Sequence, residues 1–208
     1  MHFVALPLLF GLLATSHAVP SLPKRSLSET PPPRSSEFSL AMKLGGVNGT
    51  YAPLNAVYLE DRGLLLRATN ATDAPGSPVY VNSTDSDDDY FPDALNLDLT
   101  DSPDVSAPPG VYGLFVSDPG DAHGLSSYVF GTIDEQQFDF HVADGFVYHK
   151  LTAAPQSWFA CEDIFENVTG VFLSWGVYET NYSAPPGCEW TEVIQNFNLT
   201  ARATLAWA

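Results

Sequence analysis

The sequence predicts an all-β protein: a single-domain antiparallel β-sandwich, jelly-roll-like, with few short helices and one disulfide. Short runs rich in β-branched and aromatic residues recur along the chain, and Gly, Pro, Asn and Asp punctuate them. No window carries a long apolar stripe with the 3.6-residue period of a helix. Many short strands separated by turn signals are typical of sandwiches and barrels.

Eleven segments have the composition and length of strands. In chain order they are Phe38–Leu44, Ala56–Leu59, Leu64–Thr69, Pro78–Asn82, Ala94–Leu99, Val111–Val116, Tyr128–Ile133, Phe138–Val142, Phe146–Leu151, Val171–Tyr178 and Thr191–Phe197. In the tenth segment Val171, Leu173, Trp175 and Val177 form a wholly apolar face, which we expect in the core.

One hairpin can be predicted in register. Asp144-Gly145 suits a two-residue type I′ turn, because both central positions of that turn need positive φ. The expected cross-strand pairs are Val142 with Val147, His141 with Tyr148, Phe140 with His149 and Asp139 with Lys150. Period-2 alternation then gives one buried face, made of Phe138, Phe140, Val142, Val147 and Leu151.

The same register argues against a metal site. His141 and His149 resemble a metal-binding pair in the sequence, yet in this hairpin they project to opposite faces. The third histidine of the expected domain, His123, has no evident partner in its loop. We therefore predict no metal site and no cofactor.

The chain begins with the features of a protein made for export. Residues Met1–Ala18 read as a signal peptide: an apolar stretch is followed by Ser16-His17-Ala18, with small residues at −3 and −1 of a cut before Val19. A buried N-terminal helix is the alternative. We predict a propeptide-like, Pro-rich disordered leader over residues 19–37, in which Lys24-Arg25 is either a processing site or a solvated charge pair. A single β-domain is expected over residues 38–208.

Charge excludes two classes of partner. Without the first 25 residues the chain has 25 acidic residues against 6 basic ones, a net charge of −19. Such a field repels nucleic acid and anionic membrane surfaces. We predict a secreted protein, extracellular or in the cell wall, with no membrane association after signal cleavage.

Six of the nine asparagines beyond the leader lie in N-x-Ser/Thr sequons, whereas a chance arrangement predicts about 1.4. Each implies N-glycosylation at a surface position. The predicted sites are Asn48, Asn70, Asn82, Asn167, Asn181 and Asn198.

Cys161 and Cys188 are the only cysteines, and a mutual disulfide is the default for two cysteines in an exported chain. Closing the loop between them stabilises the fold by about 3.5 kcal/mol in the chain-entropy model. Export argues against a catalytic thiol, because an exposed thiolate would be oxidised.

The carboxylates suggest a Ca²⁺ site and a glycosidase site, but for both groups of residues a purely structural role is favoured. The run Asp85–Asp89 offers hard oxygen ligands for Ca²⁺, but Tyr90 stands where an EF-hand loop needs glycine, so a solvated loop is favoured. A glycosidase needs two converging carboxylates, and Glu162 with Glu179 is the least arbitrary pair. That pair comes from an acidic group around the disulfide: Glu162, Asp163, Glu166, Glu179, Glu189 and Glu192.

Trp158 and Phe159 precede Cys161 and suit either a platform for a sugar ring or packing over the disulfide, which we favour. No serine has a recognisable histidine partner, and no Gly-rich phosphate loop opens a helix. The sequence assigns no catalytic residue and favours a protein that is not an enzyme.

Three C-terminal elements resemble the signature of a family of small fungal secreted proteins. They are Ser157-Trp158-Phe159-Ala160-Cys161, Val171-Phe172-Leu173-Ser174-Trp175 and Pro185-Pro186-Gly187-Cys188, and Ser36-Glu37-Phe38-Ser39-Leu40 resembles the opening of the mature domain. The resemblance implies a fungal extracellular β-domain closed by a Cys161–Cys188 disulfide, without catalytic residues. The acidic insert Asp85–Asp93 departs from the pattern.

We therefore expect a secreted fungal glycoprotein that acts by binding or by surface or cell-wall association. Its possible partners are carbohydrate or cell-wall components. The alternative is a carbohydrate-binding module or a glycosidase of the β-sandwich type.

Overall fold

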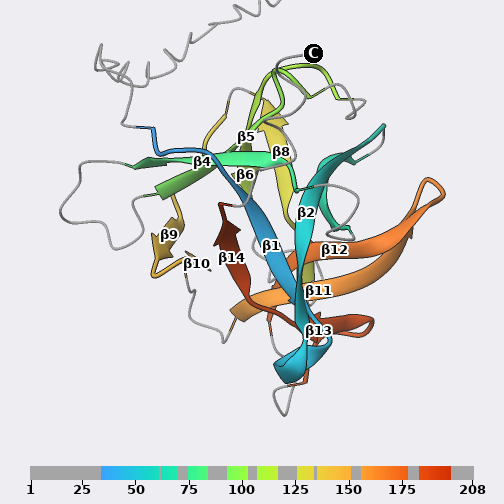
Figure 1. Ribbon diagram of the computed structural model, residues 1–208. Helices are drawn as coiled ribbons and strands as arrows, with labels where there is room; N and C mark the ends of the chain where they lie inside the picture. Colours follow the sequence, from blue (N-terminus) through green and yellow to red (C-terminus); the bar gives the residue numbers. More distant parts are fainter. Residues whose placement is uncertain are drawn as a thin grey trace, which may run out of the picture. The chain divides into compact units, whose positions relative to one another are not determined.

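The computed structural model describes residues 34–60, 62–69, 75–83, 93–102, 107–116, 126–133, 135–150, 156–177 and 183–197. All of them belong to one compact unit, Pro32–Ala208 (Figure 1). Within the described residues the protein is almost entirely antiparallel β-sheet, with one 3-10 helix, η1, at Gly46–Asn48. The predicted fold class is confirmed.

The strands are short, and two hairpins contain the longest of them. Their bounds are β1 Phe38–Leu44, β2 Thr50–Leu59, β3 Gly63–Ala68, β4 Pro78–Ser83, β5 Asp93–Asp98, β6 Val111–Phe115, β7 Ser126–Tyr128, β8 Phe130–Ile133, β9 Phe140–Ala143, β10 Phe146–His149, β11 Gln156–Phe165, β12 Val168–Val177, β13 Cys188–Trp190 and β14 Val193–Asn196.

β1 organises the sandwich because it changes partners along its length. Its residues Ala41–Leu44 pair with β2, while Phe38 and Ser39 pair with β4. Its other edge pairs with β14. Strands that switch sheets in this way form the corners of sandwiches. The main path through the sheet is β13-β11-β12-β3-β2-β1-β14-β10-β9-β5-β6-β8, and β8 pairs again with β3. Off this path, β4 pairs with β1 and β5, and β7 pairs with β12.

Two apolar clusters fill the fold. The main core includes Phe38, Met42, Leu97, Phe140 and Leu173, all 2% exposed or less. A smaller cluster of Leu59, Leu65, Phe165 and Phe172 packs with Tyr128 and Phe130. Burying this much apolar side-chain area is the dominant favourable contribution to folding.

β12 takes part in both clusters. Leu173 and Trp175 are buried, which confirms them as core residues, and Val171 is partly buried against the main core. The side chain of Val177 lies outside the described residues. Phe172 and Ser174, on the opposite face, are completely buried as well. Alternation alone predicted a mixed face there, because it cannot show that a second cluster covers that face.

The β9–β10 hairpin has the predicted register. Val147 pairs with Val142, Tyr148 with His141 and His149 with Phe140. Asp144 and Gly145 have φ of 53° and 82°, as a type I′ turn requires. The Asp139 carboxylate and the Lys150 ammonium lie 3.9 Å apart at the open end.

Most predicted strands are present, with shifted ends, but β11 and β13 were missed. The segment predicted as one strand over Tyr128–Ile133 is two strands, β7 and β8, separated by the buried Val129. β7 pairs with β12, whereas β8 pairs with β3 and β6. The two halves therefore belong to different ladders, which local composition does not report.

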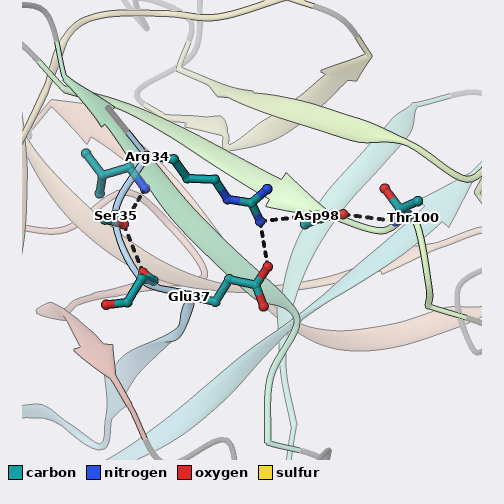
Figure 2. A network of polar contacts seen from close by, with 7 residues as sticks. Arg34, Ser35, Glu37, Asp98 and Thr100 are labelled. Atoms are coloured by element: carbon teal, nitrogen blue, oxygen red, sulfur yellow. Dashed lines mark hydrogen bonds and ion pairs between the residues drawn. The ribbon is translucent and has the colours of Figure 1, made fainter. Parts of the chain in front are cut away.

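Arg34, the first described residue and four residues before the predicted start of the domain, already packs against it. Figure 2 shows the Arg34 guanidinium donating to Glu37 and, at 2.9 Å, to Asp98 on β5. The guanidinium carbon also lies 3.7 Å from the centre of the Tyr80 ring. Burial would raise the pKa of Asp98, but hydrogen bonds from Thr100 and Arg34 outweigh it and lower that pKa. The end of the predicted leader, 34–37, is thus part of the packed unit.

The disulfide joins Cys161 of β11 to Cys188 of β13, and the two residues are cross-strand partners. No helix among the described residues is long and apolar enough to cross a membrane.

Removing the disulfide should weaken the fold substantially. We expect the double variant Cys161→Ala/Cys188→Ala to lose roughly 3 kcal/mol of unfolding free energy in urea, because its unfolded chain regains loop entropy. Adding reductant should destabilise the wild type and leave the variant unchanged. Equal stability of the two proteins would show that pairing between β11 and β13 suffices without the covalent link.

Candidate functional site: an aromatic cavity

A cavity of about 650 Å³ opens where the β9–β10 hairpin, β11, β12 and the segment from β13 to β14 meet. We call it the aromatic cavity. Its aromatic lining is Phe146, Tyr148, Trp158, Trp175 and Trp190. Its polar lining is His141, His149, Ser157, Thr191 and Glu192, and Ala143, Val147 and Val193 complete it.

Two buried tryptophans line the cavity from neighbouring strands. Trp158 of β11 and Trp175 of β12 are direct cross-strand partners, so their side chains project from the same face. Their ring centroids lie 4.8 Å apart in an edge-to-face arrangement. The Trp158 indole N–H donates to the Val147 carbonyl at 2.8 Å, which ties β11 to the β9–β10 hairpin.

Of the two alternatives for Trp158 and Phe159, burial argues against the exposed platform. Both side chains are buried, at 7% and 0% exposure, so neither is an exposed platform. Trp158 nevertheless lines the aromatic cavity, whereas Phe159, the next residue along β11, does not.

The half-exposed part of the lining comes from Trp190, Phe146 and Tyr148, which are 37%, 36% and 48% exposed. The Trp190 indole N–H donates to the Ser157 hydroxyl at 2.9 Å. Trp190 ends β13, two residues after the disulfide-bonded Cys188, so the disulfide fixes the strand that carries this indole.

His149 is enclosed by aromatic rings. Its ring centroid lies 4.8 Å from that of Trp175, 5.1 Å from that of Phe140 and 6.2 Å from that of Trp158. Neither ring nitrogen finds a hydrogen-bond partner among the described residues. Burial lowers the pKa of His149 from 6.5 to about 4, because a charged imidazolium would lose its hydration there. The ring is therefore neutral at pH 7.

Glu192 is the carboxylate of the lining, and two strands hold it. The Tyr51 hydroxyl of β2 donates to Oε2 at 2.8 Å, and the Lys43 ammonium of β1 lies 3.5 Å from the same oxygen. Burial, the hydrogen bond to Glu192 and its negative charge all raise the pKa of Tyr51. Tyr51 consequently stays a protonated donor.

The structure places the other candidate residues as follows. His141 and His149 both line the cavity, although the confirmed register puts them on opposite faces of the hairpin. Within the described part of the chain, no cluster of three or more His, Cys, Asp or Glu could hold a metal ion. Glu162 is exposed on β11 and does not line the cavity. Glu179, His123 and the Asp85–Asp89 run lie outside the described residues.

The sequence held one unused signal for this site. Glu166 and Asn167 form a two-residue turn with φ of 47° and 71°, which sets Trp158 opposite Trp175. Asn tolerates the left-handed conformation that such a turn needs. Recognising this turn would have predicted β11 and the tryptophan pair. The positions of Trp190 and Glu192 depend on pairing between distant segments and had no local signal.

His149 should make stability depend on pH. Between pH 6.5 and about 4, His149 binds a proton in the unfolded chain but not in the folded chain. The free energy of unfolding is therefore highest above pH 6.5, and it decreases as the pH is lowered from 6.5 to about 4. The shift in pKa corresponds to about 3 kcal/mol across that window. We expect His149→Phe to lack this loss in urea unfolding measured at pH 7 and pH 4.

His141→Phe is the matched control, because it changes a less buried histidine of the same hairpin. Titration of the carboxylates is common to all three proteins and cancels in their differences. The same pH dependence in wild type and His149→Phe would contradict the assignment.

No family model, no curated protein and no solved structure matches this chain. Inferences about function therefore depend on the geometry of the aromatic cavity.

Proposed function

We propose that this protein is a secreted fungal glycoprotein that binds carbohydrate, without hydrolysing it, in the aromatic cavity. The observation that carries the proposal is the cavity itself: about 650 Å³ lined by five aromatic rings and a small set of polar groups. Ligand pockets have volumes of about 300–1,000 Å³ and this balance of apolar and polar lining.

A sugar ring matches the lining because it combines an apolar C–H face with hydroxyl groups at its edge. The indole N–H of the half-exposed Trp190 is already bonded to Ser157, so this tryptophan offers its ring surface. The buried Trp158 and Trp175 form part of the cavity wall. Flat aromatic surface suits the C–H face, and the hydroxyls of Ser157 and Thr191 with the Glu192 carboxylate are the polar groups nearby.

Binding is favoured over hydrolysis by the number of carboxylates. Glycoside hydrolysis ordinarily uses two of them, about 5–5.5 Å or 6.5–9.5 Å apart. Among the described residues, Glu192 is the single carboxylate that lines the cavity. Its partner groups, Tyr51 and Lys43, suit a fixed acceptor better than an acid that exchanges a proton.

Location outside the cell is supported by three features of the chain. The N-terminal segment Met1–Ala18 has the pattern of a signal peptide, six sequons follow, and the disulfide is of the kind that oxidising compartments maintain. The resemblance to small fungal secreted proteins supports the same location and the association with a cell wall or its carbohydrates.

Ligand binding should be visible in tryptophan fluorescence, because three of the four tryptophans line the cavity. We expect emission to change on titration with fungal or plant oligosaccharides, with no reducing sugar released. Trp190→Ala should weaken binding at least about tenfold, as loss of a central aromatic contact does. Ile164→Ala, an exposed residue of β11 outside the lining, should bind as the wild type.

If no sugar on a glycan array binds the protein and none changes its tryptophan emission in titration, the proposal is wrong. Release of reducing sugar would replace binding with glycosidase activity.

The fold also discriminates among the sequons. Asn48 and Asn167 are exposed, whereas Asn82 is 7% exposed and paired with Ala94 inside the sheet. A glycan at Asn82 would have to be accommodated in that ladder. We expect peptide mapping of protein secreted from a eukaryotic host to find glycans on Asn48 and Asn167 and an unmodified Asn82. A glycosylated Asn82 in folded protein would contradict the placement of β4.

A further inference from the structure

Glu192 is held more firmly than an ordinary surface carboxylate. Its backbone carbonyl accepts from the Lys43 N–H at 3.0 Å, and the Thr191 hydroxyl donates to the Lys43 carbonyl at 2.6 Å. These bonds tie the residues before β14 to β1. The side chain is then fixed through Oε2 by Tyr51 and Lys43. Preorganised groups of this kind lose little entropy when a ligand binds.

The contacts leave the second oxygen of Glu192 for a ligand. Both side-chain contacts of the carboxylate fall on Oε2. Within the described part of the chain no protein group bonds to Oε1. Because an ionised carboxylate only accepts hydrogen bonds, the partner at Oε1 has to be a donor.

Charge balance decides which donor fits. Lys43 offsets the charge of Glu192, and no described residue of the lining is a lysine or an arginine. A cationic ligand is attracted by the negative field of the chain, but at this site it has to compete with Lys43 for the same carboxylate. An anionic ligand would meet Glu192 and the field of a chain whose net charge is −17. A hydroxyl group meets neither obstacle.

We infer that Glu192 is the specificity-determining residue of the aromatic cavity, and that it selects uncharged sugars by accepting a hydrogen bond from a ligand hydroxyl. This inference rests on the proposed function and narrows it to one class of carbohydrate. Tyr51 and Lys43 act as positioning residues: Tyr51 orients the carboxylate, and Lys43 cancels the charge that would attract an ammonium group.

The test compares three kinds of hexasaccharide by tryptophan fluorescence: neutral ones (cellohexaose, laminarihexaose and mannohexaose), the glucosamine hexamer and a hexagalacturonate. We expect the wild type to bind at least one neutral hexamer and to bind both charged hexamers at least about tenfold more weakly. Glu192→Gln should weaken the neutral interaction about tenfold, since a charged hydrogen bond is lost. Glu189→Gln on β13 is the matched control and should change nothing, because it removes the same charge outside the lining.

Lys43→Met provides a readout that a merely structural role would not move. It should raise affinity for the glucosamine hexamer, because the Glu192 charge becomes unpaired, while Lys43→Met/Glu192→Gln should lose that gain. Thermal unfolding by circular dichroism checks that each variant is folded.

Equal or tighter binding of a charged hexamer by the wild type would overturn the inference and leave the proposed function standing. The same holds if folded Glu192→Gln binds the neutral hexamer as the wild type does. Failure of every hexamer to bind would overturn the inference, whereas the wider set of sugars described under the proposed function decides that function.

Discussion

The contact between Trp158 and Trp175 is the interaction on which the rest of the site depends. The two rings pack against each other between neighbouring strands β11 and β12. The Trp158 indole N–H also donates a hydrogen bond to the Val147 carbonyl of β10. Buried indoles combine large apolar area with one polar atom that needs a partner, so they fix orientation as well as distance. His149 packs against both rings, which places the β9–β10 hairpin over the same pair of strands.

The other part of the cavity is held by covalent and polar links. The disulfide fixes β13, a strand of three residues, against β11, and Trp190 therefore lies beside Ser157. From there the chain continues to Glu192, which Lys43 and Tyr51 connect to β1 and β2. The short strand has few ladder hydrogen bonds of its own, so these links determine where its side chains lie.

How much the sequence predicts depends on how far apart the partners are. The β9–β10 register followed from Asp144-Gly145, because a two-residue turn determines every pair beyond it. β11 was not predicted as a strand because Glu162 and Asp163 interrupt its apolar pattern. In the structure the Glu162 side chain is exposed to solvent. The pairing of Lys43 with Glu192 spans 149 residues, and alternation along a strand carries no information about such a partner. Composition predicted the class of fold, and long-range pairing determined the site.

His149 explains why the cavity combines so much aromatic surface with so little net charge. Within the described residues the His149 imidazole has no hydrogen-bond partner at either nitrogen, which costs free energy in a buried site, and charging the ring there would cost more. Its ring contacts with Phe140 and Trp175 offset part of that cost. The same desolvation that keeps His149 uncharged thus prevents this residue from adding an unpaired cation to the cavity at pH 7. The negative charge of Glu192 is compensated separately by the positive charge of Lys43. Ligands are then distinguished by their shape and by the positions of their hydroxyl groups.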